Sequence, residues 1–307
     1  MRKVLISIMA CLPLLAYGQN DIQLSQQFLS RVNYNPAATG ASNYTNVFLI
    51  ARQQWIGMTA PSTQVLNAHN YFNQINSGVG LSVTNDKIGP EATINAKVGY
   101  SYYLHFEGSY LSFGLGAGIL HKSLDPNKII GETQNDPLIQ QYISNPNKLN
   151  PDFDFGVEFN TEFLQVGASV THLNKPSIQI GNLESGRHFY LYGKYTFNLD
   201  LDWKIAPSLV GHMSSWPIMQ LDVNTMATFR DRFWFGASYR FSDKFESESI
   251  VAVAGLFITD FLGLGYSYDF NPGPIKQYSS GSHEVSLRVR LGKGDTGGAG
   301  KTPRFFE

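Results

Sequence analysis

Apolar and polar residues alternate along most of this chain, and this alternation restricts the folds that it can adopt. In residues 152–160, aromatic or aliphatic side chains fill every second position, and Asp, Gly, Glu or Asn fills the positions between them. Residues 164–171, 219–224 and 284–291 follow the same pattern. A period of two residues is typical of a β-strand with one apolar and one polar face. The sequence therefore predicts a fold built from β-strands.

We identify fourteen such segments in the sequence. Several are longer than the average globular strand of about 5–6 residues and approach the ~9–11 residues that a tilted strand needs to cross a bilayer. The predicted strands are 45–52, 63–72, 77–85, 91–104, 110–121, 152–160, 163–172, 188–198, 201–212, 217–229, 232–241, 249–259, 261–270 and 282–291.

The connections between these segments differ at the two ends of the predicted sheet. One end has short turns, at 73–76, 106–109, 161–162, 199–200, 230–231 and 259–260. The other end carries two short connections, 86–90 and 213–216, and the longer loops 53–62, 122–151, 173–187, 242–248 and 271–281. Outer-membrane barrels have short periplasmic turns and longer extracellular loops. The even strand number then places both ends of the barrel in the periplasm.

The composition agrees with a barrel that faces lipid. Only 15 % of the residues are charged and 13 % are aromatic, whereas an average soluble domain has roughly 25 % charged residues. The net charge of −1 gives no basic excess for nucleic-acid binding. A secreted β-sandwich is the alternative, but it would need two domains, a linker and a charged outer face. We therefore expect an all-β fold, namely a transmembrane up-and-down antiparallel β-barrel of about 14 strands in the bacterial outer membrane.

The N-terminus indicates export from the cytoplasm. A basic start is followed by the apolar residues 4–15 and by Ala16-Tyr17-Gly18, a small-x-small cleavage signal. Cys11, the single cysteine, lies within this signal, so the mature chain has no disulfide. A lipidated Cys11 is the alternative interpretation. The predicted domains are a signal peptide (1–18), an N-terminal periplasmic or plug segment (19–44), the barrel (45–291) and a flexible periplasmic tail (292–307).

Charged residues on the polar strand faces should point into the lumen. Both signs occur, on many strands, so no single charge dominates as in an ion-selective pore. They either form ion pairs that hold the barrel or a plug in register, or line a polar passage or bind a protein segment. The expected inward charges are Arg52, Lys97, Asp152, Asp154, Glu158, Lys194, Asp222, Arg240, Asp269, Glu284, Arg288 and Arg290.

No pattern in the sequence predicts catalysis. The seven histidines form no HExxH motif and no i, i+4 pair. Ser169 and His172 are placed on opposite strand faces, which argues against a nucleophile and its base. Gly300-Lys301-Thr302 lacks the earlier glycine of a phosphate-binding loop. We expect no enzymatic activity, no cofactor and no metal site. We also expect the four tryptophans, Trp55, Trp203, Trp216 and Trp234, to be interface anchors near strand ends.

Short motifs spread over the mature chain resemble, in order and spacing, the PorP/SprF family of type IX secretion system membrane proteins. The motifs are Gln27-Phe28, Tyr34-Asn35-Pro36-Ala37, Thr39-Gly40, Arg52-Gln53-Gln54-Trp55, Gly78-Val79-Gly80, Asn85-Asp86 with Gly89, Pro151-Asp152-Phe153, Gly156-Val157, residues 167–173 with Pro176, Ala206-Pro207-Ser208, Phe233-Trp234-Phe235-Gly236, Tyr239-Arg240, residues 265–269 and Gly281-Ser282-His283-Glu284. The Gly- and Lys-rich tail departs from the family pattern. The family-motif and structural residues that we single out are Asn35, Pro36, Gly40, Gln54, Trp55, Asp86, Gly89, His172, Asp222, Arg240, Asp269, His283 and Glu284.

The resemblance implies a non-enzymatic barrel of Gram-negative bacteria that export surface adhesins and, in some species, glide. The implied partners are a secreted adhesin or its C-terminal signal, type IX components of the periplasm and outer membrane, and lipid, with no nucleic acid. We therefore expect a protein that assists export or surface attachment of a partner by protein–protein binding. A passive outer-membrane channel for small or hydrophobic solutes is the alternative.

Overall fold

The computed structural model describes residues 21–42, 44–125, 128, 147–176, 186–215, 218–242 and 247–292. The predictions for the signal peptide, for Cys11 and Trp216, for most of loop 122–151 and for the tail beyond residue 292 lie outside the described residues.

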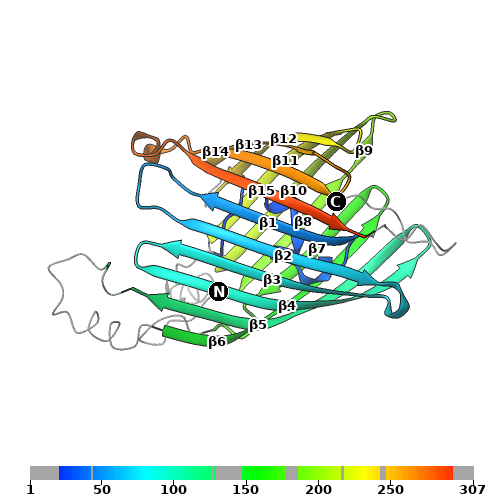
Figure 1. Cartoon of the computed structure of the whole chain (residues 1–307), viewed down its shortest axis with the longest axis horizontal. Coiled ribbons are helices and arrows are strands. Elements are labelled where there is room, and N and C mark those ends of the chain that lie inside the picture. The colour runs from blue at the N-terminus through cyan, green and yellow to red at the C-terminus, as the bar shows by residue number, and fades with distance from the viewer. Residues whose placement is uncertain are drawn as a thin grey trace, which may run out of the picture.

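Antiparallel strands make up nearly all of the described chain (Figure 1). Their bounds are β1 Thr45–Gln53, β2 Ser62–Phe72, β3 Ser77–Ile88, β4 Glu91–Phe106, β5 Ser109–Leu124, β6 Asn147–Thr161, β7 Leu164–Thr171, β8 His188–Tyr195, β9 Phe197–Asn198, β10 Trp203–Ser215, β11 Ile218–Phe229, β12 Phe233–Phe241, β13 Ser247–Phe257, β14 Leu262–Phe270 and β15 Ser282–Leu291. The helices are the short 3-10 turns η1 Gln27–Leu29, η2 Arg31–Asn33, η3 Pro36–Ala38, η4 Asn73–Ile75 and η7 Pro274–Gln277. Among the described residues, no helix is long and apolar enough to span a bilayer.

The sheet closes on itself. Strands pair with their sequence neighbours all the way round, β15 pairs with β1, and β10 pairs with β11. The two-residue strand β9 and strand β8 pair with successive parts of the same strand, β10, so together they correspond to the single predicted strand 188–198. The prediction of an up-and-down antiparallel barrel with fourteen strands is thus confirmed. Closure matters because neighbouring strands then pair all the way round, and the hydrocarbon interior of a membrane requires paired backbone groups.

The alternation of the sequence becomes an outer apolar surface and an inner polar one. On β6, Phe153 and Phe155 are 44 % and 39 % exposed, whereas Asp152 and Glu158 are fully buried. This is the reverse of a soluble protein, and it places the apolar side chains against lipid. The inward charges predicted from the sequence lie on the lumen face.

Exposed aromatic side chains gather at the short-turn end. Examples that project outward are Phe72, Phe106, Phe163, Phe197, Phe233 and Phe261. Trp203 joins this girdle, with its ring 4.8 Å from Phe229 and 6.1 Å from Phe235, as expected for an interface anchor. The same prediction is wrong for Trp234, which points into the barrel and packs 5.3 Å from the buried Phe257. Trp234 alternates with outward-facing Phe233 and Phe235, so its position in the strand sends it inward.

Candidate functional site

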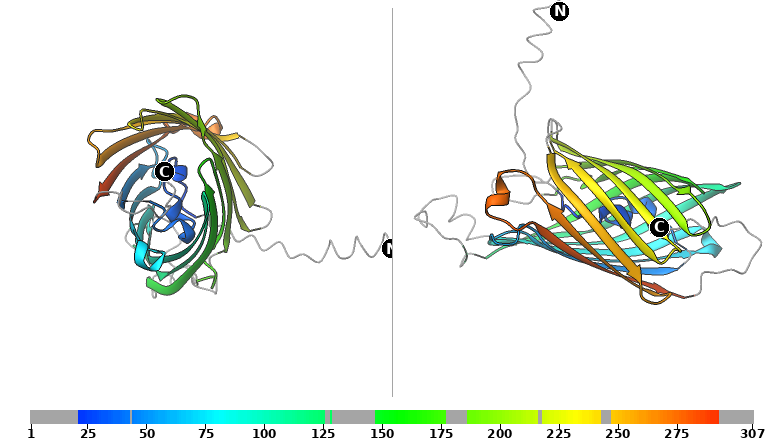
Figure 2. Two further views of the ribbon diagram at one scale, coloured as in Figure 1. Left: turned by 90° about the vertical axis from the view of Figure 1, so that its right-hand side faces the viewer. Right: turned by 90° about the horizontal axis from the view of Figure 1, so that it is seen from above.

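Residues 21–42, which we call the lumen segment, lie inside the barrel. Figure 2 shows this blue segment between opposite walls of the sheet. It consists of three 3-10 turns joined by extended residues. Asn35, Ala37 and Thr39 are completely buried. The segment is therefore an internal part of the barrel, and the site of interest is its contact with the wall.

Glycines of the wall leave the space that the lumen segment occupies. A Cβ atom on Gly78 would overlap the carbonyl oxygen of Thr39, and one on Gly114 would overlap the backbone of Ala37. On Gly99, a Cβ atom would come within 2.7 Å of the Thr39 hydroxyl. Any side chain larger than hydrogen would displace the lumen segment at these points. We call this set the glycine seat: Gly78, Gly80, Gly99, Gly114 and Gly156.

Hydroxyl groups of the wall satisfy the buried carbonyl groups of the lumen segment. Ser169 donates to the Tyr34 carbonyl at 2.6 Å, and Ser112 donates to the Ala37 carbonyl at 2.9 Å. The hydroxyls of Tyr103, at 2.7 Å, and of Ser101 donate to the Thr39 carbonyl. A buried backbone carbonyl without a donor would be costly, so these side chains are complementary to this one backbone path.

Three of the singled-out residues form the centre of this contact. Asn35 caps η3 by accepting from the Ala37 amide at 2.9 Å, and it donates to the Tyr192 hydroxyl at 2.8 Å. Pro36 is the first residue of η3, where a missing N–H costs nothing. Gly40 has a φ of +82°, and its amide donates to His69 Nδ1 at 3.1 Å. The positive φ explains why glycine stands at this turn.

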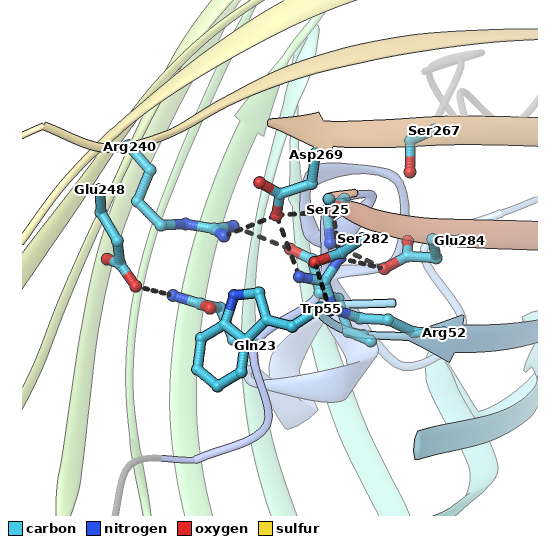
Figure 3. A network of polar contacts seen from close by, with 12 residues as sticks. Gln23, Ser25, Arg52, Trp55, Arg240, Glu248, Ser267, Asp269, Ser282 and Glu284 are labelled. Atoms are coloured by element: carbon cyan, nitrogen blue, oxygen red, sulfur yellow. Dashed lines mark hydrogen bonds and ion pairs between the residues drawn. The ribbon is translucent and has the colours of Figure 1, made fainter. Parts of the chain in front are cut away.

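A second part of the contact is a cluster of buried charges from five strands. Arg52 lies 2.9 Å from Asp269 and 3.5 Å from Glu284, and Arg240 lies 3.0 Å from Asp222 and 3.5 Å from Asp269. We call these five residues the Arg52–Arg240 cluster, and Figure 3 labels four of them, Arg52, Arg240, Asp269 and Glu284. The singled-out residues Asp222, Arg240, Asp269 and Glu284 are thus brought together, although they stand far apart in the sequence.

The Arg52–Arg240 cluster binds the backbone of the lumen segment. The two carboxylate oxygens of Glu284 accept from the amides of Ser25 and Gln26, each at 2.8 Å. Arg240 donates to the Leu24 carbonyl at 3.1 Å, and Ser25 contacts both Arg52 and Asp269. The cluster has three carboxylates and two guanidinium groups, and the backbone amides stabilise its remaining negative charge.

In a third contact, the lumen segment supplies the cation. Arg31 lies 2.8 Å from Glu158, with both side chains at most 5 % exposed. Asn160 donates to the same carboxylate at 2.7 Å, and the Tyr192 hydroxyl also contacts it. Glu158 is therefore compensated by a residue of the lumen segment, and removing that segment would leave its charge unpaired.

His172 and Ser169 both face the lumen, which corrects the prediction that they lie on opposite faces. Ser169 points inward from β7, whereas His172 follows the strand with a φ of +56°, and this left-handed conformation turns its ring inward. His172 Nδ1 lies 2.8 Å from Asp152, which also pairs with Lys97 at 2.8 Å. Ser169 bonds a backbone carbonyl instead, so the two residues do not form a nucleophile–base pair.

Two titratable groups of the lumen segment have shifted pKa values. Burial raises the pKa of the Tyr34 hydroxyl well above its usual value. Burial also acts to raise the pKa of Asp21, but the nearby His188, His172, Lys97 and His212 hold it well below its usual value. The segment thus carries a neutral Tyr34 and an ionised Asp21 at neutral pH. Within the described part of the chain, no group of three or more His, Asp or Glu side chains is arranged to hold a metal ion.

The other singled-out residues lie toward the long-loop end of the barrel. Gln54 and Trp55 follow β1, where their backbone amides donate to the Pro61 carbonyl at 3.0 Å and to the Ser282 hydroxyl at 3.1 Å. Gly89 occupies the turn between β3 and β4 with a φ of +55°.

Asp86 and His283 make local contacts in the strands near this end. Asp86 on β3 accepts from the Thr63 hydroxyl, and His283 on β15 lies 2.6 Å from the Tyr266 hydroxyl. Both contacts join neighbouring strands of the wall.

Sequence reasoning missed the residues through which the lumen segment binds the wall, namely Ser25, Gln26 and Arg31. It also did not predict that glycines in the strands leave space for the backbone of the lumen segment. Glycine inside a strand often marks the close approach of another backbone, and Gly78, Gly99 and Gly114 follow this rule. The glycines within the predicted strands could therefore have indicated, from the sequence alone, that another backbone packs against the wall.

No curated protein matches this chain. Among solved structures it is similar to the outer-membrane protein Omp33 of Acinetobacter baumannii, with 13 % identity and a TM-score of 0.48 over 81 % of this chain and 98 % of that one. A triple mutant of the Rhodopseudomonas blastica porin gives 8 % identity and a TM-score of 0.37 over 81 % and 99 % of the two chains.

The model of the type IX secretion system membrane protein PorP/SprF matches residues 16–289, which is most of the chain and includes the lumen segment and every strand up to β15. The closed barrel, with an apolar outer face and a polar interior, is the architecture of a protein of the bacterial outer membrane. This chain belongs to the PorP/SprF family of type IX secretion system membrane proteins.

Proposed function

We propose that this protein is a non-enzymatic outer-membrane component that assists the export or surface attachment of a partner adhesin or other secreted protein by binding it. The family match over residues 16–289 is the observation that carries this proposal. Type IX secretion components of the periplasm and the outer membrane are the proposed partners, together with the secreted protein or its C-terminal signal.

The interior of the barrel favours protein binding over solute passage. Glu284 of β15 and Arg240 of β12 bind backbone groups of the lumen segment, and Arg52 of β1 and Asp269 of β14 contact its Ser25 hydroxyl. The glycine seat leaves space for the same segment, and the wall hydroxyls donate hydrogen bonds to its carbonyl groups. A passive channel would instead expose its inward charges to a continuous aqueous passage. We therefore propose that the lumen segment closes the barrel, and that the protein acts through the surfaces at its two ends.

Removal of the gene from its native bacterium tests this proposal. We expect a secreted surface protein to be lost from the cell surface and to accumulate in the periplasm, because its export step lacks a binding partner. Surface digestion with protease followed by mass spectrometry measures this change, and leakage of a periplasmic marker reports whether the membrane stays intact. Expression of the intact gene should restore surface delivery. Unchanged surface delivery of every type IX substrate would contradict the proposal.

A further inference from the structure

The wall contacts of the lumen segment show in which direction it runs through the barrel. The two ends of the barrel differ, because loops 53–62 and 271–281 lie at one end and the short turns 230–231 and 259–260 lie at the other. Figure 1 shows η7 of loop 271–281 at the left end and β9 at the right end. Outer-membrane barrels place their long loops on the cell surface and their short turns in the periplasm. The wall residues that contact each part of the segment therefore report which side of the membrane that part faces.

The carboxyl end of the lumen segment lies at the short-turn end. The Gly40 amide donates to His69 Nδ1 at 3.1 Å, and His69 lies three residues before the end of β2. The Thr39 carbonyl packs against Gly78, the second residue of β3. Since β2 and β3 are joined by the short turn η4, Thr39 and Gly40 face the periplasmic side of the barrel.

The amino end of the lumen segment lies at the opposite end. Gln23 donates to Glu248 at 3.0 Å (Figure 3) and to Gln220 at 3.1 Å. Glu248 is the second residue of β13, and Gln220 is the third residue of β11. The carboxylate of Asp21 accepts from the hydroxyl of Tyr190, the third residue of β8, at 2.9 Å. All three strands begin at the long-loop end, so these contacts place Asp21 and Gln23 at the cell-surface mouth.

Residues between these two ends contact intermediate positions of the wall. Ser25 bonds Glu284, which lies two residues after β15 begins at the long-loop end. Arg31 pairs with Glu158, which lies three residues before β6 ends at a short turn. The segment has thus passed from the long-loop half of the barrel to the short-turn half by Arg31.

The lumen segment has the length and the backbone contacts that a membrane crossing requires. Its 22 residues reach up to roughly 44 Å at the ~2.0 Å per residue of a 3-10 helix, whereas the outward apolar band of a barrel is ~25 Å tall. A chain outside the sheet can cross a membrane only where protein surrounds it and satisfies its backbone groups. Wall hydroxyls donate to the carbonyls of Tyr34, Ala37 and Thr39, which meets this condition.

We propose that the lumen segment crosses the outer membrane inside the barrel, with Asp21 at the cell surface and Gly40 at the periplasmic end. Asp21 and Gln23 then belong to the cell-surface face of the protein, together with Glu248. This inference goes beyond the proposed function and does not depend on it, because it concerns only the side of the membrane that each end of the segment faces.

Surface labelling of intact cells tests the inference. An epitope tag is inserted directly before Asp21, and two control proteins carry the same tag after Tyr278, which is exposed in loop 271–281, or after Arg230 in a short turn. We expect the antibody to label the Asp21 and Tyr278 tags on intact cells, and proteinase K to abolish both signals. The Arg230 tag should be labelled only after the outer membrane is permeabilised. Labelling of the Asp21 tag only after permeabilisation would overturn the inference.

Cross-linking of the untagged protein covers the case in which the tag itself displaces the segment. Cysteine pairs are introduced in a Cys11→Ser background, which contains no other thiol. A short bis-maleimide should join Gln23→Cys to Gln220→Cys, but it should not join Gln23→Cys to Asp231→Cys at the opposite end of the barrel. Mass spectrometry of tryptic digests identifies the joined peptides, and heat-dependent mobility on SDS gels checks that each variant is folded. Absence of the Gln220 cross-link, or a cross-link at Asp231, would contradict the proposed direction.

Discussion

Replacement of Gly78 by alanine is expected to expel the lumen segment from its place. The added Cβ would overlap the Thr39 carbonyl oxygen and come within 2.6 Å of the Ser101 hydroxyl oxygen. Overpacking of an interior typically costs 1–3 kcal/mol, and here both backbones are fixed by hydrogen bonds. We therefore expect the free energy of unfolding to fall by about 3 kcal/mol. Urea unfolding in detergent, followed by tryptophan fluorescence, measures this loss.

Gly211 provides the control, because it is also a glycine within a strand of the wall. A Cβ atom there would lie 3.6 Å from the Leu191 carbonyl oxygen, which is ordinary contact. Gly211→Ala should change the unfolding free energy by less than about 0.5 kcal/mol, as substitutions away from special features do. Equal stability of the Gly78 and Gly211 variants would show that the lumen segment does not occupy the glycine seat.

Arg240→Ala is expected to cost about 3–5 kcal/mol, because removal of one partner leaves buried charges uncompensated. Arg240 is 1 % exposed and pairs with both Asp222 and Asp269. It also donates to the Leu24 carbonyl, so its loss weakens the hold on the lumen segment as well. Faster trypsin cleavage after Arg31, measured by mass spectrometry, should accompany the lower unfolding free energy.

The corresponding change in an exposed ion pair should have little effect. Arg230 pairs with Asp202 at 3.1 Å, but its side chain is 64 % exposed. Exposed ion pairs are screened by water and contribute little to stability, so Arg230→Ala should leave unfolding and cleavage nearly unchanged. A loss of the same size for both arginines would mean that the Arg52–Arg240 cluster does not hold the lumen segment.

The strands could be predicted from the sequence because their alternation reflects lipid on one side and a polar interior on the other. The start of β6 was placed too late, at residue 152, whereas the strand begins at Asn147. Pro151 caused this error, since proline rarely occurs inside a sheet. It is tolerated because β7 pairs only with residues 155–160 of β6. The proline nitrogen therefore faces an edge where no partner strand needs its N–H.

The path of the lumen segment could not be predicted in this way. Short 3-10 turns have no periodicity, and their positions depend on wall residues that are more than a hundred positions away, as with Arg31 and Glu158. Asp222, Arg240, Asp269 and Glu284 lie in the lumen, as expected from the sequence. Two of them, Arg240 and Glu284, bind backbone groups of Leu24, Ser25 and Gln26. A backbone partner leaves no complementary charge for sequence analysis to find.

Electrical conductance in a planar lipid bilayer tests most directly whether the lumen segment closes the barrel. The full chain should show no steady conductance. A variant that lacks residues 21–42 but still shows the heat-dependent mobility of a folded barrel should open a steady, ohmic pore, because a barrel of this size encloses a wide lumen. Equal, steady conductance of the two proteins would contradict the central claim that these residues close the lumen.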